Sequence, residues 1–209
     1  MSIYLARNGK MLTRLNGTRN FGRTVSPVPP GPTPPTPTPT EVTIGNQTWG
    51  TKNLAVTDWG EGIATKVVNY GQGDVTEYYY TWPAAVRIAN LIEGWHLPSV
   101  EEYETLASNV GGIFNAGTKL KSTYGWDPSS YAGTDDYGFC ALPAGLGTRF
   151  SSEGLELYDF GKQSKFWTSS TSTGTTTYAV TKYFNGTLSM NAQSEGKYDC
   201  YCTVRLIKD

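Results

Sequence analysis

The chain offers few side chains for acid–base or nucleophilic chemistry. His96 is the only histidine, so a Ser-His-Asp or Cys-His pair would have to be built around it. It lies in the turn Gly94–Pro98, immediately before a helix start, where an imidazole that hydrogen-bonds to nearby backbone is the simpler interpretation. We therefore interpret His96 as part of the scaffold and not as a catalytic base.

The three cysteines are Cys140, Cys200 and Cys202. Two residues apart on a strand, Cys200 and Cys202 would share a face at about 6.5–7 Å, which is too far for a disulfide. The simplest interpretation is a reduced protein in which the thiols are small buried hydrophobic groups. A bridge from Cys140 to one of the other two is the alternative. Because the Cys-x-x-Cys spacing is absent, a zinc site is not expected.

Acidic side chains form two adjacent pairs, Glu101-Glu102 and Asp135-Asp136. The second pair lies in segment 133–138, Gly-Thr-Asp-Asp-Tyr-Gly, which is typical of a turn stabilised by side-chain carboxylates. Such a turn can also hold calcium, but turn formation alone explains these residues. No P-loop, GxGxxG or GxSxG motif is present. We therefore expect no enzymatic activity, no metal and no cofactor.

Segment 168–177, Thr-Ser-Ser-Thr-Ser-Thr-Gly-Thr-Thr-Thr, has a different character. Small hydroxyl side chains beside Trp167 and Tyr178 form an adaptable polar surface of the kind found in binding loops. The alternative is a solvent-exposed loop without a partner.

The elements that would position these residues include two helices. Ser99 and Glu102 form a Ser-x-x-Glu capping box, which predicts a helix over Ser99–Val110 that ends at Gly111-Gly112. An earlier helix is predicted over Thr81–Leu91, with Thr81 as its N-cap and a proline in its first turn. No helix is expected after residue 112.

The rest of the body is predicted to form strands and turns. Residues 42–49 form a hairpin around Gly45-Asn46, Lys52–Val56 is a short strand, and the glycine-rich residues 58–74 are loops. Later strand candidates are Lys119–Ser122, Phe139–Leu142, Phe166–Ser169, Tyr178–Phe184, Leu188–Asn191 and Cys200–Ile207. Two early helices followed by strands predict an α+β fold with a mixed, mostly antiparallel sheet.

Composition divides the chain into three parts. Residues 1–24 hold five basic side chains and no acidic one, whereas the remainder holds 12 basic and 18 acidic side chains. Residues 25–40 include eight of the 12 prolines, which predicts an extended spacer of about 40 Å. Residues 41–209 form the globular body.

The basic segment 1–24 has too few apolar residues for a core of its own. We expect a docking or trimerising anchor, with a disordered basic tail as the alternative. Its basic residues are spaced without a pattern, so nucleic-acid binding is not expected. The chain shows neither the apolar run of a secretory signal nor the roughly 20 apolar residues that span a bilayer. We therefore expect neither general export nor a membrane span.

Six motifs occur along the body in a defined order. They are Val42–Trp49 with Asn53-Leu54, Gly94–Ser99, Gly117–Trp126, Gly133–Phe139 with Ala141–Pro143, Phe166–Ser170 and Val204–Asp209. In this order and spacing they resemble the Fibrobacter succinogenes major paralogous domain family, over residues 42–209. The resemblance implies a C-type-lectin-like fold, of the branch related to formylglycine-generating enzymes, and an origin in Bacteroidota or their phages.

The resemblance also implies where a ligand would bind. A subset of the family resembles the target proteins of diversity-generating retroelements, in which the segment after the Phe-Trp-x-Ser-Ser motif is varied to change a ligand-binding surface. Carried onto this chain, the candidate ligand-binding residues are Thr171, Thr173, Thr175, Thr177, Tyr178, Val180, Tyr183, Asn185, Asn191, Tyr198, Asp199 and Tyr201. The Glu-Pro-Asn and Trp-Asn-Asp motifs of animal lectins are absent, so calcium-dependent sugar binding is not implied. Cys200 and Cys202 do not match the active-site pair of formylglycine-generating enzymes.

Together these features favour a non-enzymatic receptor-binding head of a phage or prophage virion, at a tail tip or fibre tip. An anchor, a stiff spacer and a body without an export signal fit a protein that is assembled in the cytoplasm. Residues 1–24 would contact a virion structural protein, and the body would bind a host-surface glycan or protein. A homo-oligomer such as a trimer is compatible with this arrangement, but the sequence leaves the oligomeric state open. A bacterial cell-surface adhesin is the alternative, and an enzyme of the formylglycine-generating type is less favoured.

Overall fold

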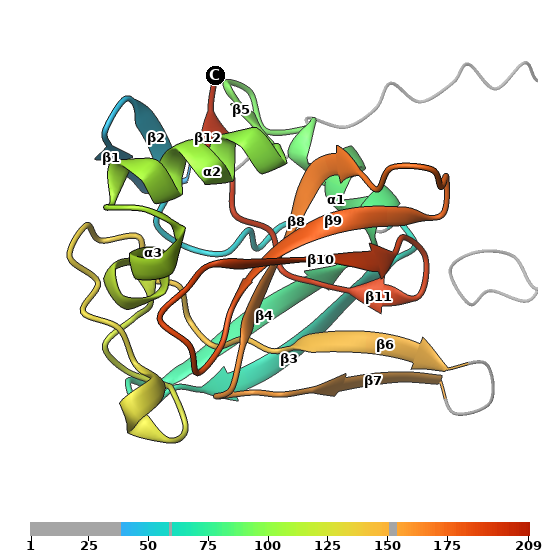
Figure 1. Cartoon of the computed structure of the whole chain (residues 1–209). Coiled ribbons are helices and arrows are strands. Elements are labelled where there is room, and N and C mark those ends of the chain that lie inside the picture. Colours follow the sequence, from blue (N-terminus) through green and yellow to red (C-terminus); the bar gives the residue numbers. More distant parts are fainter. Residues whose placement is uncertain (1–38, 59, 151–153) are drawn as a thin grey trace, which may run out of the picture. The chain divides into compact units, whose positions relative to one another are not determined.

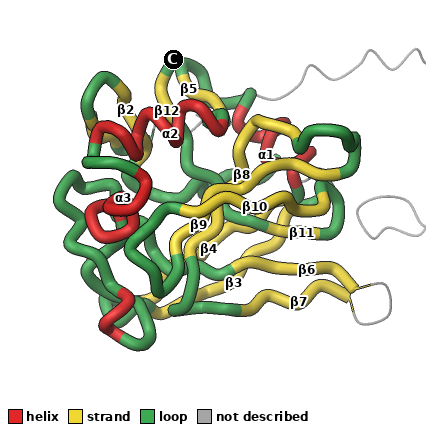
Figure 2. The backbone as a smooth tube through the Cα atoms, in the orientation of Figure 1, coloured by secondary structure: helices red, strands yellow, loops and turns green. Residues whose placement is uncertain are grey.

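The computed structural model describes residues 39–58, 60–150 and 154–209, so the expectations for segment 1–24 and most of the spacer lie outside the described residues. Within the described ranges the chain forms three α-helices, one short 3₁₀ helix and twelve strands (Figures 1 and 2). Every pairing between these strands is antiparallel. The fold is therefore α+β and mostly strand, with one helix more than the two predicted.

One sheet joins the beginning and the end of the body. β1 (Glu41–Ile44) and β2 (Gln47–Gly50) form the predicted hairpin, with Gly45 at its turn in the left-handed region (φ 64°). β12 (Ile207–Lys208) pairs with β2 on one side and with β5 (Trp95–His96) on the other. The sheet order is β1-β2-β12-β5, which places the only histidine beside the last strand.

A second sheet, of order β10-β9-β8, carries most of the candidate ligand-binding residues on its strands and on the two loops that connect them. β8 (Ser164–Thr171) contains a predicted strand, and β9 (Tyr178–Phe184) has the predicted bounds. β10 spans Asn191–Gly196, so the prediction of a strand at Leu188–Asn191 is wrong except for its last residue. The preceding residues form a loop because their backbone bonds to a helix, as in the 3.2 Å bond from Thr118 N to the Leu188 carbonyl oxygen.

Two hairpins of the structure were not predicted from the sequence. β3 (Ile63–Asn69) pairs with β4 (Asp74–Tyr80), although residues 58–74 were assigned to loops. The glycines of this segment lie in the turn and before β3, not in the strands, and Gly62, Gly71 and Gly73 have the positive φ values that glycine adopts without strain. β6 (Leu146–Phe150) pairs with β7 (Gly154–Tyr158) and with the short β11 (Cys200–Tyr201).

The two predicted helices are confirmed. α1 spans Trp82–Ala89 and follows Thr81, which occupies the N-cap position without a side-chain cap bond. α2 spans Val100–Asn109 and begins with the predicted capping box. Ser99 Oγ accepts from Glu102 N (3.2 Å) and Glu102 Oε2 accepts from Ser99 N (2.7 Å). No helix among the described residues is long and apolar enough to cross a membrane.

A third helix, α3 (Ile113–Leu120), contradicts the prediction of no helix after residue 112 and of a strand at Lys119–Ser122. It contains Asn, Gly and Thr, which have weak helix propensity, so its local signal is poor. Packing stabilises it instead, because Ala116, Gly117 and Leu120 are buried. A one-turn 3₁₀ helix, Ser129–Tyr131, follows.

Two other predicted strand segments, Lys52–Val56 and Phe139–Leu142, are not strands. Leu54 N donates to the Val204 carbonyl oxygen (2.8 Å) as a single backbone bond, and Cys140 has a positive φ of 52°, which interrupts the extended backbone. In Lys52–Val56, the Tyr80 hydroxyl accepts from Val56 N (3.1 Å) and lies 2.8 Å from the Val56 carbonyl oxygen. The Arg205 guanidinium donates to the carbonyl oxygen of Phe139 (2.5 Å), within predicted strand Phe139–Leu142. Arg205 also lies within the last predicted strand, Cys200–Ile207, in which only the residues of β11 and the first residue of β12 are assigned to strands.

Buried apolar side chains form two clusters, one containing the inner face of α1 and the other those of α2 and α3. In the second cluster the ring centre of Phe166 lies 6.2 Å from that of Phe139 and 6.4 Å from that of Phe184, and both ring pairs are edge to face. This geometry is favourable for aromatic pairs. Phe166 belongs to β8, so this packing fixes the sheet that carries the candidate site.

Candidate ligand-binding surface

One end of the β10-β9-β8 sheet brings together part of the predicted site. The 172–177 loop connects β8 to β9, and the turn 197–199 follows β10 at the same end (Figure 1). Lys197 N donates to the Thr177 carbonyl oxygen (2.9 Å), so loop and turn lie side by side. The exposed predicted residues at this end are Thr171, Thr173, Thr177, Tyr178, Tyr198 and Asp199, while Thr175 is half-buried.

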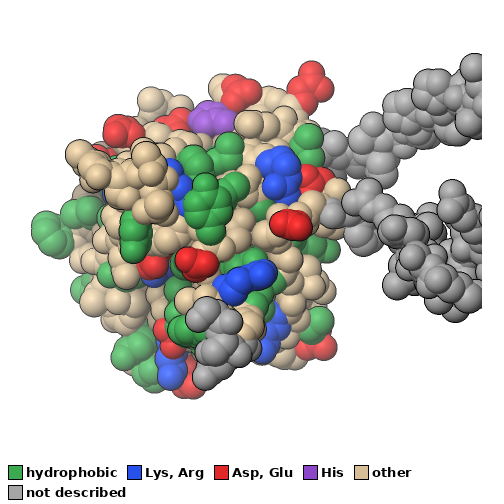
Figure 3. Space-filling view, turned by 90° about the vertical axis from the view of Figure 1, so that its right-hand side faces the viewer, with side chains coloured by type: hydrophobic (Ala, Val, Ile, Leu, Met, Phe, Trp, Pro, Cys, Tyr) green, Lys and Arg blue, Asp and Glu red, His purple; other side chains and the backbone are tan. Residues whose placement is uncertain are grey.

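Three exposed aromatic residues lie at this end, and we call Phe150, Tyr178 and Tyr198 the aromatic surface. Tyr178 is 47% exposed, Tyr198 62% and Phe150 42%. Phe150 ends β6, whose residue Arg149 donates its backbone N–H to the Asp199 carbonyl oxygen in the turn (2.7 Å). Figure 3 faces this end and shows hydrophobic side chains in the middle of the face with acidic and basic ones beside them.

Sequence reasoning missed Phe150. Its strand was not predicted, and a single aromatic residue after an arginine carries no recognisable signal. Its place in the site depends on the register between β6 and β11, strands about fifty residues apart, in which Thr148 pairs with Cys200.

The 172–177 loop is held by Lys197, which is only 7% exposed. Its Nζ donates to the Thr176 carbonyl oxygen (2.9 Å) and lies 4.4 Å from the centre of the Trp82 ring, in cation–π geometry. Its carbonyl oxygen accepts from Trp82 N (3.0 Å). One buried lysine therefore connects the loop, the turn and the start of α1.

Hydroxyl groups add further bonds inside the loop. Thr175 Oγ1 accepts from Thr177 N (3.2 Å), and Ser172 Oγ donates to Ser194 Oγ on β10 (2.7 Å). The predicted polar surface over residues 168–177 does not include its first residues, since residues 168–171 belong to β8, as the predicted strand Phe166–Ser169 implied for the first two, and Thr168 is fully buried. The loop is thus shorter and better ordered than the sequence suggested.

A second group of predicted residues lies at the opposite end of β9. Tyr183, Asn185 and Asn191 are half-buried, and the seven residues of β9 separate them from Tyr178 by about 20 Å. Asn185 Oδ1 accepts from the backbone N of Thr187 (3.0 Å), so this asparagine stabilises its own loop. One ligand of small size cannot contact both groups.

Of the predicted residues, Tyr201 does not reach the surface and Val180 reaches it only in part. Tyr201 is 2% exposed, and its hydroxyl accepts from Arg149 Nη2 (2.6 Å). It lies on β11, where both faces of the strand are buried, so Tyr201 is not exposed to a ligand at the surface and instead packs beneath the site. Val180 is half-buried in the middle of β9, and its carbonyl oxygen accepts from Thr168 Oγ1 (2.8 Å).

The cysteines are free in the structure. Cys200 and Cys202 are buried, as predicted, but their Sγ atoms are 3.5 Å apart, closer than the backbone spacing implied. The side chains turn toward each other and share a hydrogen bond, in which either thiol can be the donor, but they form no disulfide. Burial raises the pKa of Cys202, and a protonated thiol is a poor nucleophile.

His96 contacts carboxylates and not the backbone that was predicted. Nδ1 lies 2.7 Å from Asp209 Oδ1 and Nε2 lies 2.8 Å from Glu102 Oε1. Burial lowers the pKa of His96, but its hydrogen bonds to Glu102 and Asp209 outweigh burial and raise it. The imidazole therefore ties the last strand to the first turn of α2, which is a scaffold role.

Asp135 fixes a turn, as its position in the sequence predicted. It has a left-handed backbone (φ 47°), and its Oδ1 accepts from Cys140 N (2.7 Å). Among the described residues no three His, Cys, Asp or Glu side chains are placed to hold a metal ion.

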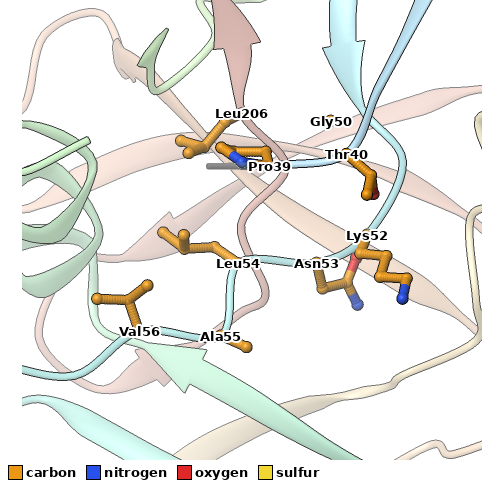
Figure 4. A pocket seen from close by; sticks show the side chains of 9 residues that line it. All are labelled: Pro39, Thr40, Gly50, Lys52, Asn53, Leu54, Ala55, Val56 and Leu206. Atoms are coloured by element: carbon orange, nitrogen blue, oxygen red, sulfur yellow. The ribbon is translucent and has the colours of Figure 1, made fainter. Parts of the chain in front are cut away.

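A pocket of about 230 Å³ lies beside the start of the body, and none of the three residues of the aromatic surface lines it (Figure 4). It is lined by Pro39, Thr40, Gly50, Lys52, Asn53, Leu54, Ala55, Val56 and Leu206. Asn53 is already engaged, since it donates to Glu77 Oε2 (2.9 Å) and accepts from Arg205 Nη2 (3.0 Å). The pocket thus offers mainly apolar contact and few free polar groups.

Comparison with known proteins identifies the family alone. No curated protein and no solved structure matches the chain. The model of the Fibrobacter succinogenes major domain matches residues 42–208, which is nearly the whole body and agrees with the resemblance seen in the motifs. The chain therefore belongs to the Fibrobacter succinogenes major domain family.

Proposed function

We propose that this protein is a non-enzymatic receptor-binding head of a phage or prophage virion, and that its aromatic surface binds a host-surface glycan or protein. One observation carries the proposal: three exposed aromatic side chains share one end of the body with a hydroxyl-rich loop that a buried lysine holds in place. Tyrosine offers contact area at low entropic cost. Fixing the loop in advance lowers the ordering cost of binding.

The residues with catalytic potential support a non-enzymatic role. Cys200 and Cys202 are buried, and His96 is held between two carboxylates. None of the three belongs to the aromatic surface. This makes an enzyme of the formylglycine-generating type the weaker proposal.

We extend the proposal to a C-type-lectin-like arrangement with a diversified surface. The pairing of β12 with the first hairpin, which closes the body on itself, supports the arrangement. Thr171, Thr173, Tyr178 and Tyr198 are exposed, so changes at these positions would leave the core intact. That property suits residues that vary between copies of a gene.

Binding to isolated host cells and to a glycan array tests the proposal. The full chain should bind, and the double variant Tyr178→Ala/Tyr198→Ala should bind at least about tenfold more weakly, which corresponds to about 1.4 kcal/mol. Val67→Ala, which removes a side chain 59% exposed on β3, is the matched control and should bind normally. Equal binding by the double variant would refute the assignment of the surface.

Mass spectrometry of purified particles tests the location. Peptides of this chain in virions support the phage proposal. Their presence in the outer-surface fraction of cells, with none in particles, would replace it with the adhesin alternative.

A further inference from the structure

An exposed arginine adjoins the aromatic surface. Arg149 immediately precedes Phe150 and donates its backbone N–H to the Asp199 carbonyl oxygen (2.7 Å), in the turn that also carries Tyr198. Within residues 39–58, 60–150 and 154–209, no carboxylate forms an ion pair with its guanidinium. Arg149 is therefore a positive charge at the candidate site that the described part of the chain does not neutralise.

The guanidinium of Arg149 is nevertheless held in place. Its Nη2 donates to the Tyr201 hydroxyl (2.6 Å), and its Cζ lies 5.6 Å from the centre of the Tyr201 ring. Tyr201 is 2% exposed and pairs with Gly147 of β6, so it is a fixed support. An arginine carries five N–H donors in a planar fork. Because this one side-chain bond occupies a single donor, most of the fork remains free for a ligand that is met at low ordering cost.

Two acidic residues lie near Arg149, and neither is paired with it. Asp199 is its neighbour across the ladder, but the Asp199 carboxylate is directed toward the end of β10, with Oδ2 at 3.9 Å from where a Cβ on Gly196 would lie. Glu195 is already paired, since its Oε1 lies 2.5 Å from Lys165 Nζ. Only Asp199 therefore opposes the charge of Arg149 on this side.

The remaining charges at this end favour a positive balance. Glu156 of β7 pairs with Thr148, and alternate side chains of a strand point to opposite faces, so Glu156 points away from the face of Arg149. Lys197 adds a second positive charge beneath the 172–177 loop. Two positive side chains, Arg149 and Lys197, thus lie beside one unpaired carboxylate, that of Asp199. Electrostatic complementarity favours an anionic ligand here.

The loop beside the same turn offers free hydroxyl groups. Among the residues that the structure describes, Thr171, Thr173 and Thr176 are exposed and their hydroxyls have no hydrogen-bond partner. A hydroxyl both donates and accepts, as the hydroxyl groups of a sugar do. The face of a tyrosine ring is negative and attracts the weakly positive C–H groups of a sugar ring. Loop and aromatic surface together match a carbohydrate.

We propose that the ligand of the aromatic surface is an acidic glycan, and that Arg149 binds its carboxylate. This inference rests on the proposed binding function and narrows the ligand class. A planar guanidinium binds a carboxylate through two parallel hydrogen bonds, which a lysine does not provide. An acidic peptide also carries carboxylates, but the free threonine hydroxyls match the many hydroxyl groups of a glycan better.

Binding of the full chain to matched glycan pairs tests the inference. The members of a pair differ in one terminal sugar, which is a hexuronate in one member and the corresponding neutral hexose in the other. The full chain should bind the hexuronate member at least about tenfold more tightly, and added salt should reduce this preference. Equal binding within the pairs overturns the proposal, as does binding to host cells without binding to any hexuronate glycan.

Three variants assign the preference to the arginine. Arg149→Gln should bind both members of a pair equally, with the affinity of the parent chain for the neutral member. Tyr201→Phe keeps the ring but removes the acceptor that orients the guanidinium, so its preference should be intermediate. Lys66→Gln removes another exposed cation, one that lies 4.6 Å from the centre of the Phe160 ring, and is the matched control that should keep the full preference. A full preference in Arg149→Gln overturns the role of Arg149.

The proposed function and this inference fail in different ways. The double variant Tyr178→Ala/Tyr198→Ala should lose affinity for both members of a pair, whereas Arg149→Gln should lose only the preference for the acid. A chain that binds neither cells nor glycans contradicts the proposed function itself. Protease treatment of host cells that abolishes binding assigns the ligand to a protein and overturns the inference alone. Circular dichroism of each variant confirms that the fold is intact.

Discussion

Replacing Lys197 with methionine tests whether a single buried side chain holds the candidate binding loop. The methionine keeps most of the apolar stem but removes the bond from Nζ to the Thr176 carbonyl oxygen and the cation–π contact with Trp82. A hydrogen bond from a charged donor contributes about 1.5–3 kcal/mol, and a partly desolvated cation–π contact about 1–2 kcal/mol. Since Thr176 is exposed, water replaces the lost donor at its carbonyl oxygen. We therefore expect a loss of about 2 kcal/mol, near the lower end of that range.

Two measurements check this value. For a chain of this size, 2 kcal/mol lowers Tm by about 4–8 °C. Amide hydrogen exchange should accelerate in residues 172–178 and remain unchanged in β1 and β2, because the loop loses its clamp while the distant sheet does not. Lys197→Arg keeps the charge and should recover part of the loss. Ligand binding should weaken in proportion to the loosening of the loop.

Lys208→Met is the matched control, since Lys208 also lies over a tryptophan ring, at 5.8 Å from the centre of Trp95. Its side chain is 46% exposed in an ion pair with Glu41, so its removal should cost less than about 1 kcal/mol. If Lys197→Met had an unchanged Tm and unchanged amide hydrogen exchange in residues 172–178, the proposal that Lys197 holds the loop would be refuted. Equal losses in both lysine variants would show that burial of Lys197 has no special effect.

Three further predictions concern stability. Gly117→Ala should lower the free energy of unfolding by about 1–3 kcal/mol, because the added Cβ would lie 2.5 Å from the Leu188 carbonyl oxygen. Urea titration measures this change, and an unchanged urea concentration at the midpoint of unfolding would contradict the close approach. The pKa of His96 is raised in the folded state, so the protonated imidazole stabilises the fold fully below pH 6.5, and this stabilisation is lost as pH rises through the folded-state pKa. In thermal melts, His96→Gln should lack this part of the pH dependence of Tm. Identical plots of Tm against pH for the variant and the parent chain would refute the prediction. Burial lowers the pKa of Lys121 from 10.5 to about 8. Because the unfolded state holds this proton more tightly, the free energy of unfolding should rise as pH increases between these two values. Lys121→Met should lack that rise, and a rise of equal size in the variant would exclude Lys121 as its source.

Local sequence determined the parts of the fold whose hydrogen bonds close within a few residues. The capping box of Ser99 and Glu102 places the start of α2 because both of its bonds span three residues. The hairpin around Gly45 follows from a turn that needs a positive φ. β9 was predicted with its observed bounds because aromatic and β-branched residues fill it from one turn to the next.

Tertiary contacts decided the parts with weak local signals. α3 forms from poor helix formers because its inner face is buried and Gly117 meets the loop at Leu188. The Arg205 guanidinium, some 65 residues away in sequence, donates to the carbonyl oxygens of Phe139 and Cys140. These contacts join residues that are far apart in the chain, so no local pattern predicts them.

The candidate site divides in the same way. The hydroxyl-rich sequence and the family resemblance together predicted that residues after the Phe-Trp-x-Ser-Ser motif would be polar and exposed, and Thr173, Thr177 and Tyr178 are exposed. Only the tertiary structure shows that Phe150 belongs to the candidate site, that Tyr201 is buried, and that Asn185 lies at the far end of β9. The physical reason is register: which side chains share a surface depends on how distant strands pair, and a shift of one residue exchanges the exposed and buried faces.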